Sequence, residues 1–325
     1  MLVSIVIPLY NVEPYIERCL TSVAAQTFRP LEVVLVDDCS TDGSLQRAQA
    51  VVPALKREGM TFVFKQHEQN CGAATTRNTG IRTATGNYVY FLDGDDEITH
   101  DCIEVLAAPL QHGNYDFTIA DFEVQGGTVG CMPLGIEGVC EDVIGAYSDC
   151  RVYSMPVNKL VNLSFLRRNN LFFKDGMPFE DELWSFQLAC MTKRIYGVKH
   201  QTYIYHLRTD STMGTASKEH YIEWRFRIAP LMWEYIDRHG MSENLAANNT
   251  TEAFIQSAHP IFVLGKGNEG YEYYKRVRKM NHRPRSIYWR LSLTSLTGFV
   301  KYFHYLLPLP VGFILKVVLR RLHGG

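Results

Sequence analysis

The chain has 325 residues, 46% of them hydrophobic and 21% charged, and its 33 Lys and Arg against 34 Asp and Glu leave a formal net charge of −1. This length and composition exclude a disordered chain and fit either two domains or one large one. The eight cysteines include no CxxC pair, which argues against a zinc ribbon or a disulfide scaffold and suits a reducing compartment. The opening MLVSIVIPLYN lacks a basic start and a small-residue cleavage site, so we interpret it as a buried strand rather than a secretion signal.

The first hundred residues alternate apolar runs typical of strands with segments that repeat apolar residues at helical spacing. We expect Asn11 to cap the first helix, and Ser40, Thr41 or Asp42 to cap the second. Continuous apolar strands separated by helices indicate an α/β fold with a mainly parallel sheet covered on both faces. The predicted strands are 4–9, 31–36, 61–64 and 88–92, and the predicted helices are 16–23, 45–55 and 73–84.

Beyond residue 100 the pattern is less regular. We predict strands at 116–122 and 201–206, a loop over 126–138 and a helix over 179–191. Residues 219–280 have the spacing of a mostly helical region.

An acidic cluster ends the fourth predicted strand, in YFLDGDDEI, where Asp93, Asp95, Asp96 and Glu97 follow one another closely. Such acids repel one another unless a cation or water screens them. Asp93 and Asp95 flank Gly94, so both short side chains can point at one hard cation such as Mg²⁺ or Mn²⁺. The alternative is a solvated polar turn, but the carboxyl end of a parallel strand is where such sheets bind ligands, which favours a metal site.

Two other segments are expected at the same edge of the sheet. Asp37 and Asp38 end the second predicted strand, where they either begin a turn with Ser40 or accept hydrogen bonds from a base or a ribose. In NCGAATTRNTGI, small residues such as Gly72 allow close backbone approach, and Arg77 can meet a diphosphate near a helix start. Ordinary helix packing with a solvated arginine is the alternative for this segment.

The segments SIVIPLYN, VVLVDDCSTDGS, NCGAATTRNTGI and YFLDGDD occur in an order and spacing that closely resemble inverting family-2 glycosyltransferases of the GT-A fold. A weaker resemblance continues through VNKL, FEDELW and YHLRTDS. The resemblance implies a GT-A domain over 1–215, with a sugar-nucleotide-binding half over 1–100 and an acceptor-binding half over 101–215. A C-terminal helical region would follow over 216–325.

Residue by residue, the resemblance implies that Asp95 is the main metal ligand and that Asp93 meets the metal or the ribose. Asp38, with Asp37 beside it, would contact uracil or another base, and Arg77 would lie near the base or the diphosphate. His206 and Arg208 would close over the diphosphate, although a histidine on an apolar strand is more often structural. The donor-binding residues implied are Pro8, Tyr10, Asp37, Asp38, Arg77, Asp93, Gly94, His206 and Arg208.

The resemblance places Asp181, in FEDELW, at the position of the catalytic base. Glu180 is the alternative if the register shifts by one residue. Without the upstream motifs, we would interpret this segment as an acidic helix start that complements the helix dipole, formed by Glu180, Asp181 and Glu182.

The implied reaction is the transfer of a sugar from a nucleoside-diphosphate donor, UDP by default, to a saccharide acceptor with inversion, assisted by Mn²⁺ or Mg²⁺. A sugar-phosphate nucleotidyltransferase is one alternative, but it needs a Gly-rich basic loop after the first strand, where this chain has PLYNVEPY. A non-catalytic carbohydrate- or membrane-binding relative is the other, and the intact Asp93, Asp95 and Asp181 argue against it.

The tail has a charge of its own. From Tyr273 to Gly325 there are 11 Lys and Arg and no Asp or Glu, so the remainder carries 22 basic against 34 acidic residues. Its apolar run over 302–315 contains Pro308 and Pro310 and is too short to span a membrane. We predict that the tail lies on an anionic membrane, although it could pack on its own domain or on a partner subunit. A lipid-linked saccharide acceptor and a cytoplasmic, peripheral location on the inner face of the cell membrane would follow, with no nucleic-acid partner.

Overall fold

The computed structural model describes residues 1–127, 133–177, 179–207, 218–256, 267–280, 283–293 and 302–322. The chain divides into two compact units, Met1–Thr215 and Ala216–Gly325. Seven cysteines lie in the described ranges, and all seven are free thiols.

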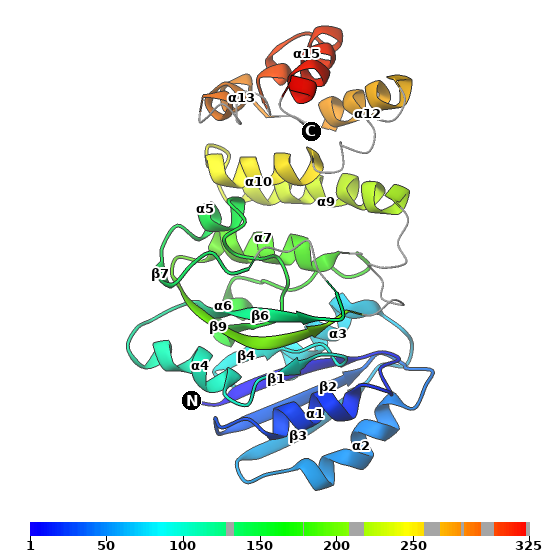
Figure 1. The fold of residues 1–325 in the computed structure, drawn as a ribbon, viewed down its shortest axis with the longest axis vertical. Coiled ribbons are helices and arrows are strands. Elements are labelled where there is room, and N and C mark those ends of the chain that lie inside the picture. Colours follow the sequence, from blue (N-terminus) through cyan, green and yellow to red (C-terminus); the bar gives the residue numbers. More distant parts are fainter. Residues whose placement is uncertain are drawn as a thin grey trace. The chain divides into compact units, whose positions relative to one another are not determined.

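One nine-stranded mixed sheet organises the N-terminal unit (Figure 1). Its first half is parallel, in the order β3-β2-β1-β4, and the second half adds β8, β6, β9 and β5, with β7 paired to β9. The strands are β1 (Val3–Leu9), β2 (Leu31–Asp37), β3 (Met60–Gln66), β4 (Tyr88–Phe91), β5 (Glu97–Ile98), β6 (Phe117–Gln125), β7 (Gly138–Cys140), β8 (Lys159–Asn162) and β9 (Ile195–His206).

The four parallel strands form where the apolar runs predict them. All seven residues of β2 are buried, as are six of the seven in β1, because helices cover both faces of a parallel sheet. Helix α3 packs on β1 and β2 and comes close to the sheet at Gly80, where a Cβ atom would lie 2.2 Å from Val6 Cγ1. The helices are α1 (Ile16–Ala24), α2 (Ser44–Leu55), α3 (Gly72–Thr83), α4 (Cys102–Ala107), η1 (Ala108–Gln111), α5 (Val143–Ser148), α6 (Leu163–Arg168) and α7 (Glu180–Met191).

Three local predictions need correction. The N-cap of α2 is Gly43, which has no side-chain cap, although Asp42 Oδ1 accepts a hydrogen bond from Ser44 N over 3.0 Å. Asn11 does not cap a helix, because α1 begins only at Ile16 and Asn11 instead joins two loops: its Oδ1 accepts a hydrogen bond from Thr41 N over 2.9 Å. The predicted loop over 126–138 gives way at its end to β7, which starts at Gly138 and pairs with β9. Residues 128–132 of that loop lie outside the described ranges.

The C-terminal unit is helical where it is described, with α9 (Lys218–Arg238), α10 (Leu245–Gln256), α12 (Gly267–Met280), α13 (Arg285–Ser292), η2 (Phe303–Leu306) and α15 (Leu309–Leu322). Helix α10 packs on α9 and α13, while α15 packs on η2 and α12. Among the residues that the structure describes, no helix combines the length and apolarity needed to cross a membrane.

Candidate active site

The predicted site residues follow neighbouring parallel strands, so the sheet brings them to one edge. Asp37 is the last residue of β2 and Asp93 follows β4 by two residues, while His67, to which the sequence analysis gave no role, follows β3 directly. Because β1 to β4 are parallel, these carboxyl ends face the same side, which is where open α/β sheets bind ligands.

Asp96 fixes the acidic turn after β4 to strand β9. Its side chain is buried, and its oxygens accept hydrogen bonds from the Tyr203 hydroxyl (2.6 Å) and from His206 N (2.8 Å). Burial and the neighbouring charges of Asp93 and Asp95 raise the pKa of Asp96 to about 8. Sequence reasoning gave Asp96 no role of its own, and its place as the third acid of DGDD was the only signal.

Arg77, on α3, bridges two acidic segments that lie far apart in the sequence. Its Nη2 lies 2.9 Å from Asp93 Oδ1, and its Nη1 lies 2.7 Å from Glu180 Oε1 at the start of α7. The guanidinium is buried, and burial opposes its charge, but Asp93 and Glu180 together raise the pKa of Arg77. Arg77 therefore stays charged, and Glu180 serves as its partner, a role that the sequence did not reveal.

Asp181 lies in the first turn of α7 beside this bridge. Burial first, and then the charges of Glu182 and Glu180, raise the pKa of Asp181 to about 7, while Arg77 acts in the opposite direction. A carboxylate with a pKa near neutrality can accept a proton at neutral pH and hold it, which is what a general base must do.

The turn of Asp93, Gly94 and Asp95 offers the oxygen donors that Mg²⁺ and Mn²⁺ prefer. The Asp93 side chain is 30% exposed, and the backbone carbonyl of Asp95 accepts a hydrogen bond from Arg18 Nη2 over 2.7 Å, which holds the turn. Gly94 packs closely, because a Cβ there would lie 3.1 Å from Pro8 O. Burial first, and then the charges of Asp93 and Asp95, raise the pKa of Asp96, so part of that shift comes from the negative charge of this turn. The residues present therefore fit a hard divalent cation.

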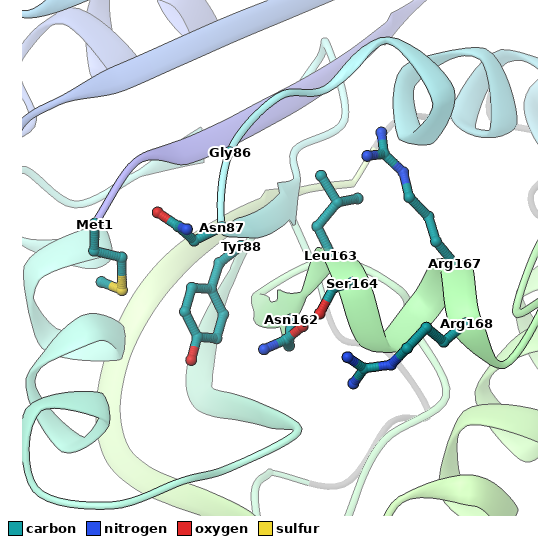
Figure 2. Close-up of a pocket in the computed structure, with 9 residues that line it drawn as sticks. All are labelled: Met1, Gly86, Asn87, Tyr88, Asn162, Leu163, Ser164, Arg167 and Arg168. Carbon is teal, nitrogen blue, oxygen red and sulfur yellow. Dashed lines mark hydrogen bonds between the residues drawn. The ribbon is translucent and has the colours of Figure 1, made fainter.

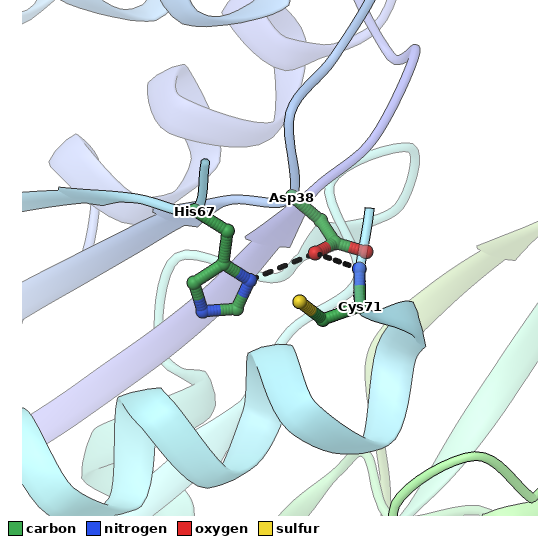
Figure 3. Close-up of side chains that lie close together, drawn as sticks. All are labelled: Asp38, His67 and Cys71. Atoms are coloured by element: carbon green, nitrogen blue, oxygen red, sulfur yellow. Dashed lines mark hydrogen bonds and ion pairs between the residues drawn. The ribbon is translucent and has the colours of Figure 1, made fainter. Parts of the chain in front are cut away.

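The two acids at the end of β2, Asp37 and Asp38, have different surroundings. Asp38 accepts hydrogen bonds from Cys71 N, Gly72 N and His67 Nδ1, each over 2.8 Å. Figure 3 shows the bonds from Cys71 and His67. These contacts anchor the start of α3, so we interpret the close group of Asp38, His67 and Cys71 as a helix anchor rather than a metal site. Asp37 is also buried, but its Oδ1 has no hydrogen-bond partner in the described part of the chain.

The remaining predicted donor residues lie at or near this edge where they are described. Pro8 is the penultimate residue of β1, and Tyr10, just after β1, is 47% exposed. His206 Nε2 lies 2.7 Å from Glu97 Oε1, so His206 is held by the acidic turn. Arg208 lies outside the described residues.

A hollow of about 690 Å³ elsewhere on the N-terminal unit is not this site (Figure 2). Asn87 and Tyr88, at the amino end of β4, line it together with Asn162 and Arg168, whereas the acidic turn follows the other end of β4. None of the predicted donor, metal or catalytic residues that the structure describes lines it.

The sheet, its acidic edge and the relatives of the chain define a glycosyltransferase of the GT-A fold, as the motifs predicted. Residues 4–171 match the family described as "Glycosyl transferase family 2", so the chain belongs to that family. It is 28% identical over 227 residues to the glycosyltransferase GlyG of Streptococcus pneumoniae, an alignment that covers 66% of this chain and 73% of GlyG.

Solved structures share the fold. The crystal structure of Staphylococcus aureus TarS 1–349 in complex with UDP-GlcNAc superposes with a TM-score of 0.76 at 21% identity, covering 99% of this chain and 91% of that one. The mannosyltransferase PcManGT from Pyrobaculum calidifontis, in complex with GDP-Man and Mn²⁺, superposes with a TM-score of 0.52 at 16% identity. The superposition covers 98% of this chain and 86% of PcManGT.

Proposed function

We propose that this glycosyltransferase moves a sugar from a UDP-sugar donor to a saccharide acceptor in a single displacement that inverts the anomeric carbon. The observation that carries the proposal is the Arg77 bridge, because it joins the acidic turn at Asp93 to the start of α7, where Asp181 lies. In this proposal residues 1–100 bind the donor and 101–215 bind the acceptor. The likeness to TarS, which binds UDP-GlcNAc, supports a UDP-sugar and makes UDP-GlcNAc the first donor to test.

Donor recognition would begin at the end of β2. The buried Oδ1 of Asp37 can accept a hydrogen bond from a base N–H, which would give that atom the partner it lacks. The exposed ring of Tyr10, together with Pro8 and Gly94, would flank the nucleoside, while Asp38 holds the loop in shape. Arg77 and Arg208 would supply positive charge toward the diphosphate, and His206 would close over it.

Asp95, with Asp93, would hold Mn²⁺ or Mg²⁺. When bound, the cation would neutralise charge on the departing diphosphate. Support comes from the carboxylate donors of the turn and from the Mn²⁺ in the PcManGT structure. Two protein carboxylates leave further coordination positions to phosphate oxygens and water, as is common for Mg²⁺.

Asp181 would act as the general base. It would take the proton of the acceptor hydroxyl while that oxygen forms a bond to C1 of the sugar, and the bond from C1 to the diphosphate oxygen breaks on the opposite face. The raised pKa of Asp181, about 7, supports this role at neutral pH.

We further propose a lipid-linked saccharide as the acceptor, used at the inner face of the cell membrane. The acid-free basic stretch over 273–325 supports an anionic membrane as a partner of the C-terminal unit.

Purified protein tests the reaction directly. We expect UDP release from one UDP-sugar in the presence of Mn²⁺ or Mg²⁺, and loss of that release in EDTA. Proton NMR of the product should show an anomeric configuration opposite to that of the donor. Release of pyrophosphate from a nucleoside triphosphate and a sugar phosphate would instead identify a nucleotidyltransferase. Metal-independent turnover, or retention of the donor configuration, would contradict the proposed mechanism.

A further inference from the structure

Helix α15 in the C-terminal unit turns an apolar face outward. Val311 is 52% exposed and Ile314 is 62% exposed, whereas Lys316 is only 7% exposed. Residues three apart share one helix face, so Val311 and Ile314 form part of one stripe, while Gly312 and Lys316, four apart, share the buried side. This order is the reverse of the usual surface helix, which buries its apolar stripe and exposes its charges.

The packing of the opposite side fixes this orientation. A Cβ atom at Gly312 would lie 2.4 Å from His304 O and 2.7 Å from the Tyr274 hydroxyl, so only glycine lets α15 approach η2 and α12 this closely. The Phe313 ring lies against the rings of Tyr271 and Tyr274, with centroids 5.1 Å and 5.6 Å apart. Rotating α15 to bury Val311 and Ile314 would break these contacts.

The exposed apolar residues gather in this part of the chain. Seven large hydrophobic side chains are exposed among the described residues, and four of them lie between residues 293 and 314. These four are Leu293, just after α13, and Leu309, Val311 and Ile314 on α15. Of these four, Val311 and Ile314 adjoin on one helix face, and adjoining exposed apolar residues indicate an interaction site, whereas single exposed hydrophobic residues are ordinary.

The charge of the unit indicates which partner covers the stripe. Residues 216–325 contain 16 Lys and Arg against 8 Asp and Glu, a formal net charge of +8, while residues 1–215 carry −9. Two guanidiniums lie beside the segment that leads into α15: Arg278 donates to Leu307 O over 3.1 Å, and Arg285 donates to Leu306 O. A second copy of this unit would bring like charges together, whereas an anionic lipid surface complements both the charge and the apolar stripe.

We infer that α15 lies flat in the surface of an anionic bilayer, with Val311 and Ile314 among the acyl chains and the basic residues at the headgroups. With 14 residues, α15 is about 21 Å long, which is shorter than the hydrocarbon core and suits an in-plane helix. The inference deepens the proposed function, which places the acceptor in the membrane, by naming the surface that reaches the lipid.

Flotation with lipid vesicles tests this surface in the full-length chain. The probes are vesicles of phosphatidylcholine alone and vesicles with about 30% phosphatidylglycerol. We expect wild-type protein to float with the anionic vesicles, and the double variant Val311→Asn/Ile314→Asn to bind at least about tenfold more weakly because two apolar side chains no longer enter the bilayer. Val139→Asn is the matched control, since Val139 is 46% exposed in the N-terminal unit and should leave binding unchanged.

Three results would overturn the inference: no flotation of the wild type, equal flotation of the double variant, or a wild-type dimer in solution that the double variant abolishes. Circular dichroism of each variant verifies that it is folded. UDP release in lipid-free solution distinguishes the proposed transferase function from the membrane-binding role of α15. A failed donor assay with intact flotation would count against the proposed function alone. Intact donor turnover without flotation would count against this surface alone.

Discussion

Arg77 on α3 donates from Nη2 to Asp93 Oδ1 over 2.9 Å, so a buried cation already occupies one oxygen of the turn that we propose binds the metal. The other arm of the same guanidinium binds Glu180, so the acidic turn and the start of α7 share a single counter-charge. Donor and metal binding at this turn would therefore be coupled to the position of α7.

Replacing this guanidinium tests how much the bridge contributes to the stability of the fold. Arg77→Lys keeps one charge but cannot bridge two carboxylates with separate arms, so we expect the free energy of unfolding to fall by about 2–4 kcal/mol. Urea denaturation measures the change. Arg82→Lys, an exposed arginine on the same helix, is the control and should change stability by less than about 0.5 kcal/mol. A stable Arg77→Lys protein would show that the bridge contributes little to folding.

Asp181→Asn tests the base. The amide cannot take the acceptor proton, so turnover should fall by about 10²–10⁴-fold, while the affinity for the UDP-sugar stays close to that of the wild type. Steady-state kinetics and calorimetric donor binding separate these two effects. Glu180→Gln serves as the comparison for the alternative register. If Glu180→Gln lost turnover while Asp181→Asn kept it, the base would be Glu180.

The pH profile follows from the sign of the Asp181 shift. The base works only when deprotonated, and its pKa is raised to about 7, so the rate should rise with pH through about pH 7 and level off above it. The charge of Glu182 helps to raise that pKa. Glu182→Gln should therefore move the rising limb to lower pH, with the maximal rate largely kept. If the rising limb of the pH profile did not move in Glu182→Gln, it would report the titration of a group other than Asp181.

Thermal unfolding tests the metal site without any turnover. A ligand that binds only the folded state stabilises it, so Mn²⁺ together with UDP should raise the midpoint temperature of the wild type. Asp95→Asn should remove most of this rise, whereas Asp149→Asn, whose side chain is 67% exposed, should keep it. An equal rise in Asp95→Asn would place the cation elsewhere.

The parallel half of the fold and the edge that carries the acids could be predicted because both depend on local patterns. The apolar run of β2 and the motif containing Asp93 each lie within a few consecutive residues. The contacts that complete the site could not be predicted, because Tyr203 reaches Asp96 across 107 positions and Glu180 reaches Arg77 across 103. Such pairs depend on how the mixed second half of the sheet and α7 pack, which one sequence does not encode in any local spacing.

The last prediction concerns the adjacent residues Asp37 and Asp38. Substituting one should lower the stability of the fold, whereas substituting the other should lower the affinity for UDP. Asp38 accepts hydrogen bonds from two backbone N–H groups at the start of α3 and a third from His67. In Asp38→Asn, an amide N–H₂ would replace one of the accepting oxygens and would face a donor. We expect a loss of about 1–3 kcal/mol in the free energy of unfolding. Asp37 has a buried oxygen without a partner in the described chain, so Asp37→Asn should keep stability and weaken UDP binding about tenfold. Urea denaturation and calorimetric titration with UDP distinguish the two variants. If Asp38→Asn folded normally but no longer bound UDP, the base contact would belong to Asp38, as the family resemblance implies.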